Sequence, residues 1–252
     1  MPETLRIAGP DGASAEAMIF ADGPALVAGA TEFIVSEAAA AIAARGAFSV
    51  ALSGGNTPKP VYEALAGKAL DWRRVHIFFG DERCVPPDDP RSNYHMAKAA
   101  LIDRVAIPPG NIHRMRGEDD PNAAALAYAE DVKAALQPDG RFDLVLLGLG
   151  DDGHTASLFP GLAAVSETER RVVACYVESV AMWRLTLTPP SINGARRVAF
   201  LVSGADKANM IHRVLKGPRQ PVVLPSQIVR PAERPALWLI DAAAAAKLTP
   251  QA

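Results

Sequence analysis

A histidine and two aspartates follow a short apolar segment in the middle of the chain, in Asp143-Leu-Val-Leu-Leu-Gly-Leu-Gly-Asp-Asp-Gly-His-Thr-Ala-Ser157. The apolar run has the length of a buried strand in a parallel sheet and is too short to cross a membrane. The glycines within the segment permit a sharp turn and let a ligand approach the backbone. His154 then stands where open α/β sheets bind ligands, and imidazole is the side chain best suited to proton transfer near neutral pH. We therefore expect acid–base chemistry at His154.

The same segment contains the spacing Gly148-x-Gly150-x-x-Gly153, which fits the dinucleotide-binding fingerprint. That fingerprint normally lies in the first strand–helix unit, whereas here it lies beyond the middle of the chain. Asp151 and Asp152 would repel a pyrophosphate, and a dinucleotide turn does not need the histidine that follows. We therefore expect no nucleotide cofactor at this turn.

A second glycine-containing turn follows the apolar segment 48–52 and reads Ser53-Gly54-Gly55-Asn56-Thr57-Pro58. Backbone N–H groups in such a turn, together with the dipole of a helix that starts at Pro58, favour an anion. Because the Gly-Lys-Ser/Thr of a Walker A loop is missing, the turn is not of the nucleotide-triphosphate type. The sequence predicts phosphate binding by Ser53, Gly54, Gly55 and Thr57, with an ordinary tight turn as the alternative.

Charged residues also follow two other apolar segments. Asp81 and Arg83 follow segment 75–79; the arginine can clamp an anion with two hydrogen bonds, and the aspartate can position a water or a sugar hydroxyl. Lys207 enters a helix after segment 198–203, where the helix dipole opposes a cation unless an anion is bound. Arg184 is a weaker candidate of the same kind. Solvated surface charges are the alternative for all of these side chains.

The spacing of apolar residues predicts alternating helices and strands. We expect helices at 22–45, 58–65, 92–101, 122–136 and 205–215, and strands at 48–53, 75–79, 143–147, 171–177, 183–188, 198–203 and 236–240. Such alternation favours an α/β fold, a Rossmann-like three-layer sandwich with a parallel-dominated sheet and helices on both faces. Because the sequence shows no internal repeat and no linker-like change in composition, we expect one domain over residues 1–252.

Composition narrows the classes of partner. The chain has 252 residues, with 26 Lys+Arg against 28 Asp+Glu. This balance gives no net positive electrostatic field that would attract nucleic acid or an anionic membrane. Two cysteines, Cys84 and Cys175, are too few for a disulfide framework, and no metal-binding motif is present. The first residues lack a secretory pattern, so we expect a cytoplasmic protein. The sequence does not distinguish a monomer from a dimer.

Taken together, the motifs resemble those of the 6-phosphogluconolactonase family, from about Ala47 to the last expected strand. They are Ser53-Gly-Gly-Asn-Thr-Pro58, Gly80-Asp-Glu-Arg83, Gly148-Leu-Gly-Asp-Asp-Gly-His-Thr-Ala-Ser-Leu-Phe-Pro-Gly161 and Arg184-Leu-Thr-Leu-Thr-Pro-Pro. The resemblance implies hydrolysis of 6-phospho-D-glucono-1,5-lactone to 6-phosphogluconate in the pentose phosphate pathway. It also implies an α/β fold shared with glucosamine-6-phosphate deaminase and ribose-5-phosphate isomerase.

The resemblance assigns roles to individual residues as well. It implies that His154 is the catalytic base and that Arg83 and Lys207 lie at the phosphate end of the substrate, whereas the match of Arg184 to a substrate-binding arginine is looser. A lactone carbonyl is already electrophilic, so its hydrolysis requires no cofactor and no metal. One histidine can take a proton from water and return it to the ring oxygen. Asp152 or Asp81 can orient that imidazole, and N–H groups of the glycine turn can hold the oxyanion.

The sequence leaves two alternative functions. Glucosamine-6-phosphate deaminase/isomerase is similar around Asp81 and His154, but that family has a glutamate five residues after the histidine, where this chain has Phe159. It also usually has tyrosine at the position of Arg83. A non-catalytic sugar-phosphate sensor is the second alternative. Such regulators carry a DNA-binding helix-turn-helix segment, and no basic segment of that kind precedes Asp22.

Overall fold

A computed structural model describes residues 2–9, 14–136 and 138–248 of the chain. Within these residues the strands are β1 (Glu3–Ala8), β2 (Ser14–Phe20), β3 (Phe48–Leu52), β4 (Val75–Phe79), β5 (Asp81–Arg83), β6 (Leu144–Leu147), β7 (Val172–Val177), β8 (Met182–Leu187), β9 (Arg197–Val202) and β10 (Leu237–Asp241). The α-helices are α1 (Gly23–Arg45), α2 (Pro58–Leu65), α3 (Asn93–Ala100), α4 (Pro121–Ala135), α5 (Pro189–Asn193), α6 (Ala208–Lys216) and α7 (Ala242–Ala245).

The helix boundaries follow from local signals in the sequence. The side chain of Asp22 accepts a hydrogen bond from the backbone N of Ala25 at 2.8 Å and so caps the start of α1. Gly46, at a φ of 83°, ends that helix in the left-handed conformation. Ser92 caps α3 in the same way through the backbone N of His95. The predicted helices and strands are confirmed, with boundaries that differ by at most three residues.

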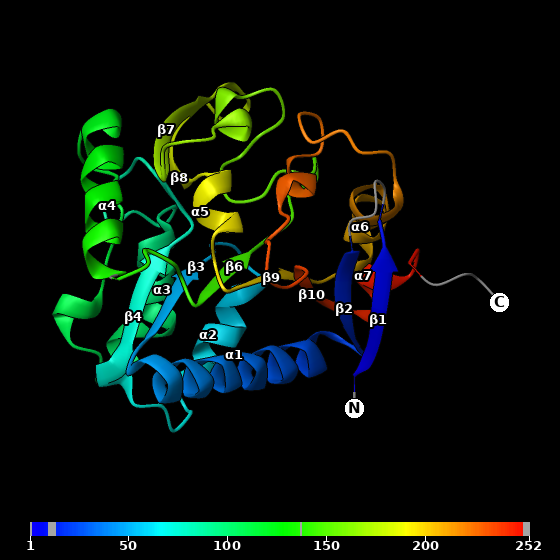
Figure 1. Cartoon of the computed structure of the whole chain (residues 1–252), viewed down its shortest axis with the longest axis horizontal. Coiled ribbons are helices and arrows are strands. Elements are labelled where there is room, and N and C mark those ends of the chain that lie inside the picture. The colour runs from blue at the N-terminus through cyan, green and yellow to red at the C-terminus, as the bar shows by residue number, and fades with distance from the viewer. Residues whose placement is uncertain (1, 10–13, 137, 249–252) are drawn as a thin grey trace.

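The main sheet has the order β1-β2-β10-β9-β6-β3-β4, and its strands are parallel except for β1. The crossovers from β2 to β3 and from β3 to β4 place α1 and α2 together on one face (Figure 1). The later crossovers run in the opposite direction along the sheet and place α4, α5 and α6 on the other face (Figure 1). The predicted fold class, a parallel-dominated sheet with helices on both faces, is confirmed.

The strand order also shows where a ligand can bind. The neighbouring strands β6 and β3 are the fifth and sixth strands in this order, and both are fully buried. The chain leaves β3 toward β4 and leaves β6 toward β9, so the two connections diverge. Such a switch point opens a crevice at the carboxyl ends of the two strands.

Three strands and one pairing pattern were not predicted. β1 and β2 form a hairpin whose outer strand is mostly exposed, and β2 (SAEAMIF) contains few residues with a high strand propensity. β5 is only three charged residues long and lies in a segment that the sequence suggested to be a turn. It pairs with β8, which pairs with β7, and all three strands form a separate antiparallel sheet.

Helix α1 has the length and apolar composition of a membrane-spanning helix. In the structure its residues Leu26, Ala30 and Ile34 are buried in the core that it shares with the main sheet. Core helices of water-soluble proteins pass the same test of length and composition, so that test alone does not indicate a membrane span.

Candidate active site

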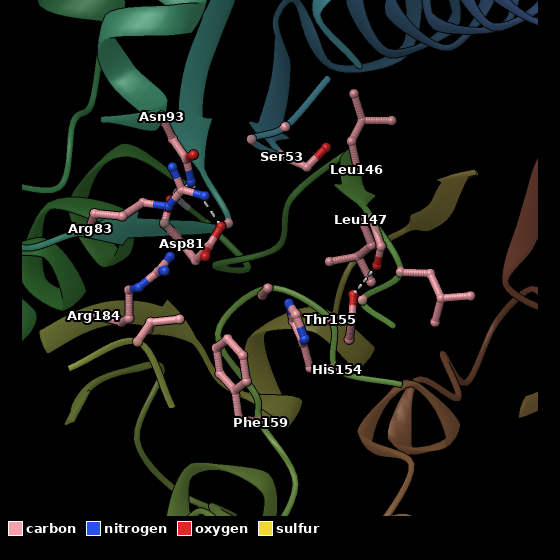
Figure 2. Close-up of a pocket in the computed structure, with 18 residues that line it drawn as sticks. Ser53, Asp81, Arg83, Asn93, Leu146, Leu147, His154, Thr155, Phe159 and Arg184 are labelled. Atoms are coloured by element: carbon pink, nitrogen blue, oxygen red, sulfur yellow. Dashed lines mark hydrogen bonds between the residues drawn. The ribbon is translucent and has the colours of Figure 1, made fainter. Parts of the chain in front are cut away.

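A cavity of about 320 Å³ opens at the carboxyl ends of β3 and β6, at the switch point of the sheet (Figure 2). Its lining comes from several turns and from the small sheet: Ser53, Gly54, Gly55, Gly80, Asp81, Arg83, Asn93, Leu146, Leu147, Gly148, Leu149, Gly150, His154, Thr155, Ala156, Phe159, Val180 and Arg184. The structure therefore brings together residues that are separated by as many as 131 positions, the distance from Ser53 to Arg184.

The turn that carries His154 is closed by its own backbone. Gly150 N donates to His154 O at 2.9 Å, and Gly153 N donates to Gly150 O at 3.0 Å. A Cβ atom at Gly150 would meet the imidazole of His154 at 2.1 Å, and Gly153 adopts a φ of +84°. Glycine is therefore required at both positions. The hydroxyl of Thr155 donates to Gly148 O at 2.8 Å and fixes the end of β6.

The imidazole of His154 is held on two sides. Its Nδ1 lies 2.5 Å from Oδ1 of Asp152, and the same oxygen accepts a hydrogen bond from the backbone N of His154 at 3.0 Å. The ring stacks on Phe159, with 4.0 Å between centroids and 24° between planes. Because Nδ1 is engaged by the carboxylate, Nε2 is the nitrogen left for chemistry. Asp152, which the sequence proposed beside Asp81, is the aspartate that contacts the imidazole.

Asp81 has different partners. It is only 8% exposed, and its carboxylate accepts a hydrogen bond from Ser157 Oγ at 2.7 Å and another from Asn93 Nδ2 at 3.0 Å. Sequence reasoning missed Asn93 and Ser157. Ser157 closes the block that contains His154, so its polar side chain gave a weak signal, whereas Asn93 follows a helix cap and gave none.

Glu82, between the two predicted residues Asp81 and Arg83, is a structural residue. Its buried carboxylate accepts hydrogen bonds from the backbone N atoms of Asn93 at 2.7 Å and Tyr94 at 2.8 Å, at the start of α3. Burial raises the pKa of Glu82, and these N–H groups oppose that rise. The contact anchors the first turn of α3 and so carries Asn93 to the cavity.

Two arginines face each other across the small sheet. Arg83 and Arg184 are directly opposite in the register of β5 and β8, and both line the cavity. The Nε atoms of both are buried and have no hydrogen-bond partner among the described residues. Burial lowers the pKa of Arg184. Directly opposed like charges destabilise a sheet, so this pair is suited to an anion that would lie between the two guanidinium groups. Figure 2 shows both groups beside Asp81.

Two buried tyrosines fix the ends of neighbouring strands. The hydroxyl of Tyr62 accepts from Ser53 N at 3.0 Å and donates to Ser53 O at 2.9 Å. The hydroxyl of Tyr128 makes the same two contacts with Phe79, at 2.9 and 3.2 Å. Burial raises the pKa of both hydroxyls. The side-chain hydroxyl of Ser53, by contrast, is buried at the cavity without a hydrogen-bond partner among the described residues, and it is therefore available to a ligand.

Two predicted phosphate-binding residues lie outside the cavity lining. Thr57 precedes α2, but its side chain makes no capping hydrogen bond. The ammonium group of Lys207 forms an ion pair with Asp151, which holds the pKa of that aspartate below its usual range. The phosphate roles of Thr57 and Lys207 remain predictions.

Metal ligation and thiol chemistry gain no support from the described part of the chain. No group of three or more His, Cys, Asp or Glu side chains there could hold a metal ion. Burial raises the pKa of the Cys84 thiol to about 11 and that of the Cys175 thiol to about 12. Both thiols are therefore protonated near neutral pH and are poor nucleophiles.

Comparisons with known proteins agree with this geometry. Residues 21–238 match the family model described as glucosamine-6-phosphate isomerases/6-phosphogluconolactonase. A 6-phosphogluconolactonase from Synechocystis sp. is 44% identical over 215 residues, which cover 83% of this chain and 88% of that protein. A 6-phosphogluconolactonase from Nostoc sp. is 41% identical over 236 residues, which cover 92% and 97%. The solved structure of a 6-phosphogluconolactonase from Trypanosoma cruzi superposes with a TM-score of 0.83 at 32% identity, covering 92% and 96%. The chain therefore belongs to the glucosamine-6-phosphate isomerase/6-phosphogluconolactonase family.

Proposed function

We propose that this chain hydrolyses 6-phospho-D-glucono-1,5-lactone to 6-phospho-D-gluconate, a step of the pentose phosphate pathway. One observation carries the proposal: a histidine paired with a carboxylate shares a single cavity with two opposed, incompletely partnered arginines. The first pair suits proton transfer and the second suits a phosphate. The names of the relatives support the same reaction.

The chemistry on this proposal uses His154 twice. Nε2 accepts a proton from water while the water oxygen attacks the lactone carbonyl carbon, and the carbonyl oxygen takes up the negative charge. Asp152, bonded to Nδ1, stabilises the imidazolium that forms. The tetrahedral intermediate then collapses, the bond from the former carbonyl carbon to the ring oxygen breaks, and the imidazolium returns its proton to that oxygen. Glycine-rich turns line the cavity, so backbone N–H groups can approach the oxyanion.

The remaining lining residues orient the substrate. Arg83 and Arg184 bind the phosphate. The carboxylate of Asp81, which Asn93 and Ser157 hold in place, accepts a hydrogen bond from a hydroxyl of the sugar. The free hydroxyl of Ser53, with the neighbouring Gly54 and Gly55, supplies further hydrogen bonds. The substrate is a soluble sugar phosphate, which fits a cytoplasmic enzyme that uses neither a cofactor nor a metal.

The deaminase alternative is not favoured. Phe159, at the position where that family has a glutamate, stacks on His154 and can neither accept nor deliver a proton. A sensor without catalytic activity is not favoured either, because the contact between His154 and Asp152 is intact.

The test is an assay of the purified protein on 6-phosphogluconolactone and, for ammonia release, on glucosamine-6-phosphate. We expect lactone hydrolysis that a chelator does not abolish, and no ammonia. His154→Ala should lower kcat by about 10²–10⁴-fold, the usual contribution of a positioned general base. His212→Ala, on the exposed side of α6, is the control and should leave kcat unchanged. Ammonia release at the rate of lactone turnover would instead establish the deaminase.

A further inference from the structure

A buried serine far along the chain contacts the turn that carries His154. Ser226 lies in the short 3₁₀ segment Pro225–Ile228 and is 3% exposed. Its backbone N and its side-chain Oγ each donate a hydrogen bond to Gly153 O at 2.9 Å. Both donors of this residue are therefore used on one carbonyl of the catalytic turn.

The segment that holds Ser226 is itself anchored. The neighbouring Gln227 accepts a hydrogen bond from Gln220 N through Oε1 at 2.6 Å. Its Nε2 donates to Val214 O at 3.2 Å and Pro218 O at 3.0 Å. The carbonyls at the end of α6 and in the loop that follows are thus tied to one buried amide. Ser226 consequently approaches the turn from a fixed support.

Close packing also joins this segment to the turn. A Cβ atom at Gly153 would meet Cδ2 of Leu224 at 2.8 Å and Sδ of Met210 at 3.3 Å. Farther along, Gly161 N donates to Val222 O at 3.0 Å. The backbone of the turn at Gly153 therefore packs closely against Leu224 and α6, and the Gly161–Val222 hydrogen bond attaches the chain that follows the turn at a second point.

The hydrogen bonds of one peptide group connect Ser226 to the imidazole. Gly153 O and His154 N belong to the same planar peptide group, so their directions are coupled. Ser226 holds the carbonyl end, and Asp152 Oδ1 accepts from the N–H end at 3.0 Å. The same Asp152 oxygen contacts Nδ1 of the imidazole. A rotation of this peptide would move the N–H and would disturb the contact that orients the ring.

We propose that Ser226 is a positioning residue for His154, acting through the Gly153–His154 peptide. The inference rests on the proposed role of His154 as general base. Ser226 is not among the residues that line the cavity, and its hydroxyl fixes the peptide whose orientation sets the imidazole.

Ser226→Ala removes the side-chain donor and keeps the backbone donor. We expect kcat to fall about 10-fold, since misplacement of a catalytic group by about 1 Å can cost up to about 10²-fold. KM should stay within about twofold of the wild-type value, because the phosphate contacts come from other turns. Ser226→Thr retains the hydroxyl and should recover most of the lost kcat.

Ser191→Ala is the matched control. Ser191 is 4% exposed, and its hydroxyl donates to Arg171 O at 2.7 Å, away from the cavity. Its loss removes the same kind of buried hydrogen bond and should leave kcat unchanged. A folded Ser226→Ala enzyme with wild-type kcat, an equal kcat loss in Ser191→Ala, or a folded Ser226→Thr enzyme as slow as the alanine variant would each overturn the proposal.

A second readout separates this inference from the proposed function. The imidazole resonances of His154 in NMR spectra, assigned with His154→Ala, should shift in Ser226→Ala and stay in place in Ser191→Ala, whatever reaction the protein catalyses. Unchanged His154 resonances in Ser226→Ala would refute the positioning role. Absence of lactone hydrolysis by the wild-type protein, with the resonances shifted as expected, would refute only the proposed function.

Discussion

Replacement of Arg184 by methionine should stabilise the free protein and weaken substrate binding at the same time. Arg184 lies opposite Arg83 in the small sheet, and its Nε is buried without a hydrogen-bond partner among the described residues. Burial lowers the pKa of Arg184; the nearby Asp81 raises it and Arg83 lowers it, and the net direction is downward, so burial outweighs the attraction of the carboxylate. Methionine keeps an unbranched apolar stem of similar length and removes the charge.

The expected magnitudes follow from these contacts. Relief of one directly opposed like-charge pair is worth about 0.2–1 kcal/mol. For a chain of this size, 1 kcal/mol moves the Tm by about 2–4 °C, so the Tm of the ligand-free variant should rise by about 0.5–4 °C. A hydrogen bond to a charged group contributes about 1.5–3 kcal/mol, so loss of the guanidinium should raise KM for the phosphorylated lactone by about 10–150-fold. Activity on unphosphorylated gluconolactone should change much less.

Thermal denaturation with and without 6-phosphogluconate, combined with steady-state kinetics on both lactones, measures these effects. Arg170→Met is the control, because Arg170 is an exposed arginine that pairs with Glu167 outside the cavity. A fall in the Tm of ligand-free Arg184→Met would contradict the argument that the arginine pair is strained. An unchanged KM, or an equal loss of activity on both lactones, would contradict a phosphate-binding role.

Two further predictions concern Asp152, which contacts His154, and the histidine pair His76 and His113. Asp152→Asn should lower kcat by about 10–10²-fold with little change in KM. This loss is smaller than that of a fully buried catalytic triad, because Asp152 is nearly half exposed. Steady-state kinetics test this prediction, and a folded variant with wild-type kcat would exclude the orienting role. His76 Nδ1 lies 3.2 Å from His113 Nε2, and burial together with that neighbour lowers the pKa of His76 below 6.5. The folded state therefore favours neutral His76, so its stability contribution is present above pH 6.5 and is lost as the pH falls through the lowered pKa. His76→Gln should reduce the difference in Tm between pH 7.5 and pH 5.5, and an unchanged difference would contradict the reasoning.

The sequence was sufficient to predict features that depend on residues close together in the chain. His154 and Asp152 are two residues apart, so Asp152 was one of the two aspartates, with Asp81, that the sequence proposed to orient the imidazole, and the structure shows that Asp152 makes the contact. The buried strands β3, β6 and β9 were predicted because each is a nearly continuous apolar run. Short-range signals of this kind survive in almost any tertiary context.

Contacts between distant segments were not predictable from the sequence. The opposition of Arg83 and Arg184 depends on the register of a small sheet whose edge strand, β5, is only three residues long. Asn93 reaches the cavity because Glu82 anchors the start of its helix, and Ser226 acts on a turn 73 residues earlier. No periodicity or spacing encodes such pairings, because they result from how whole elements pack.

The position of β10 in the sheet has a consequence for how the chain folds as it is synthesised. The last strand in the chain order, β10, lies between β9 and β2, so among the described residues the pair β1 and β2 joins the rest of the sheet by strand pairing through β10 alone. Until residues 237–241 have left the ribosome, β9 and β2 each present an open edge that can pair with another chain. We infer that nascent chains shorter than this length are prone to aggregate and that insertion of β10 completes the fold.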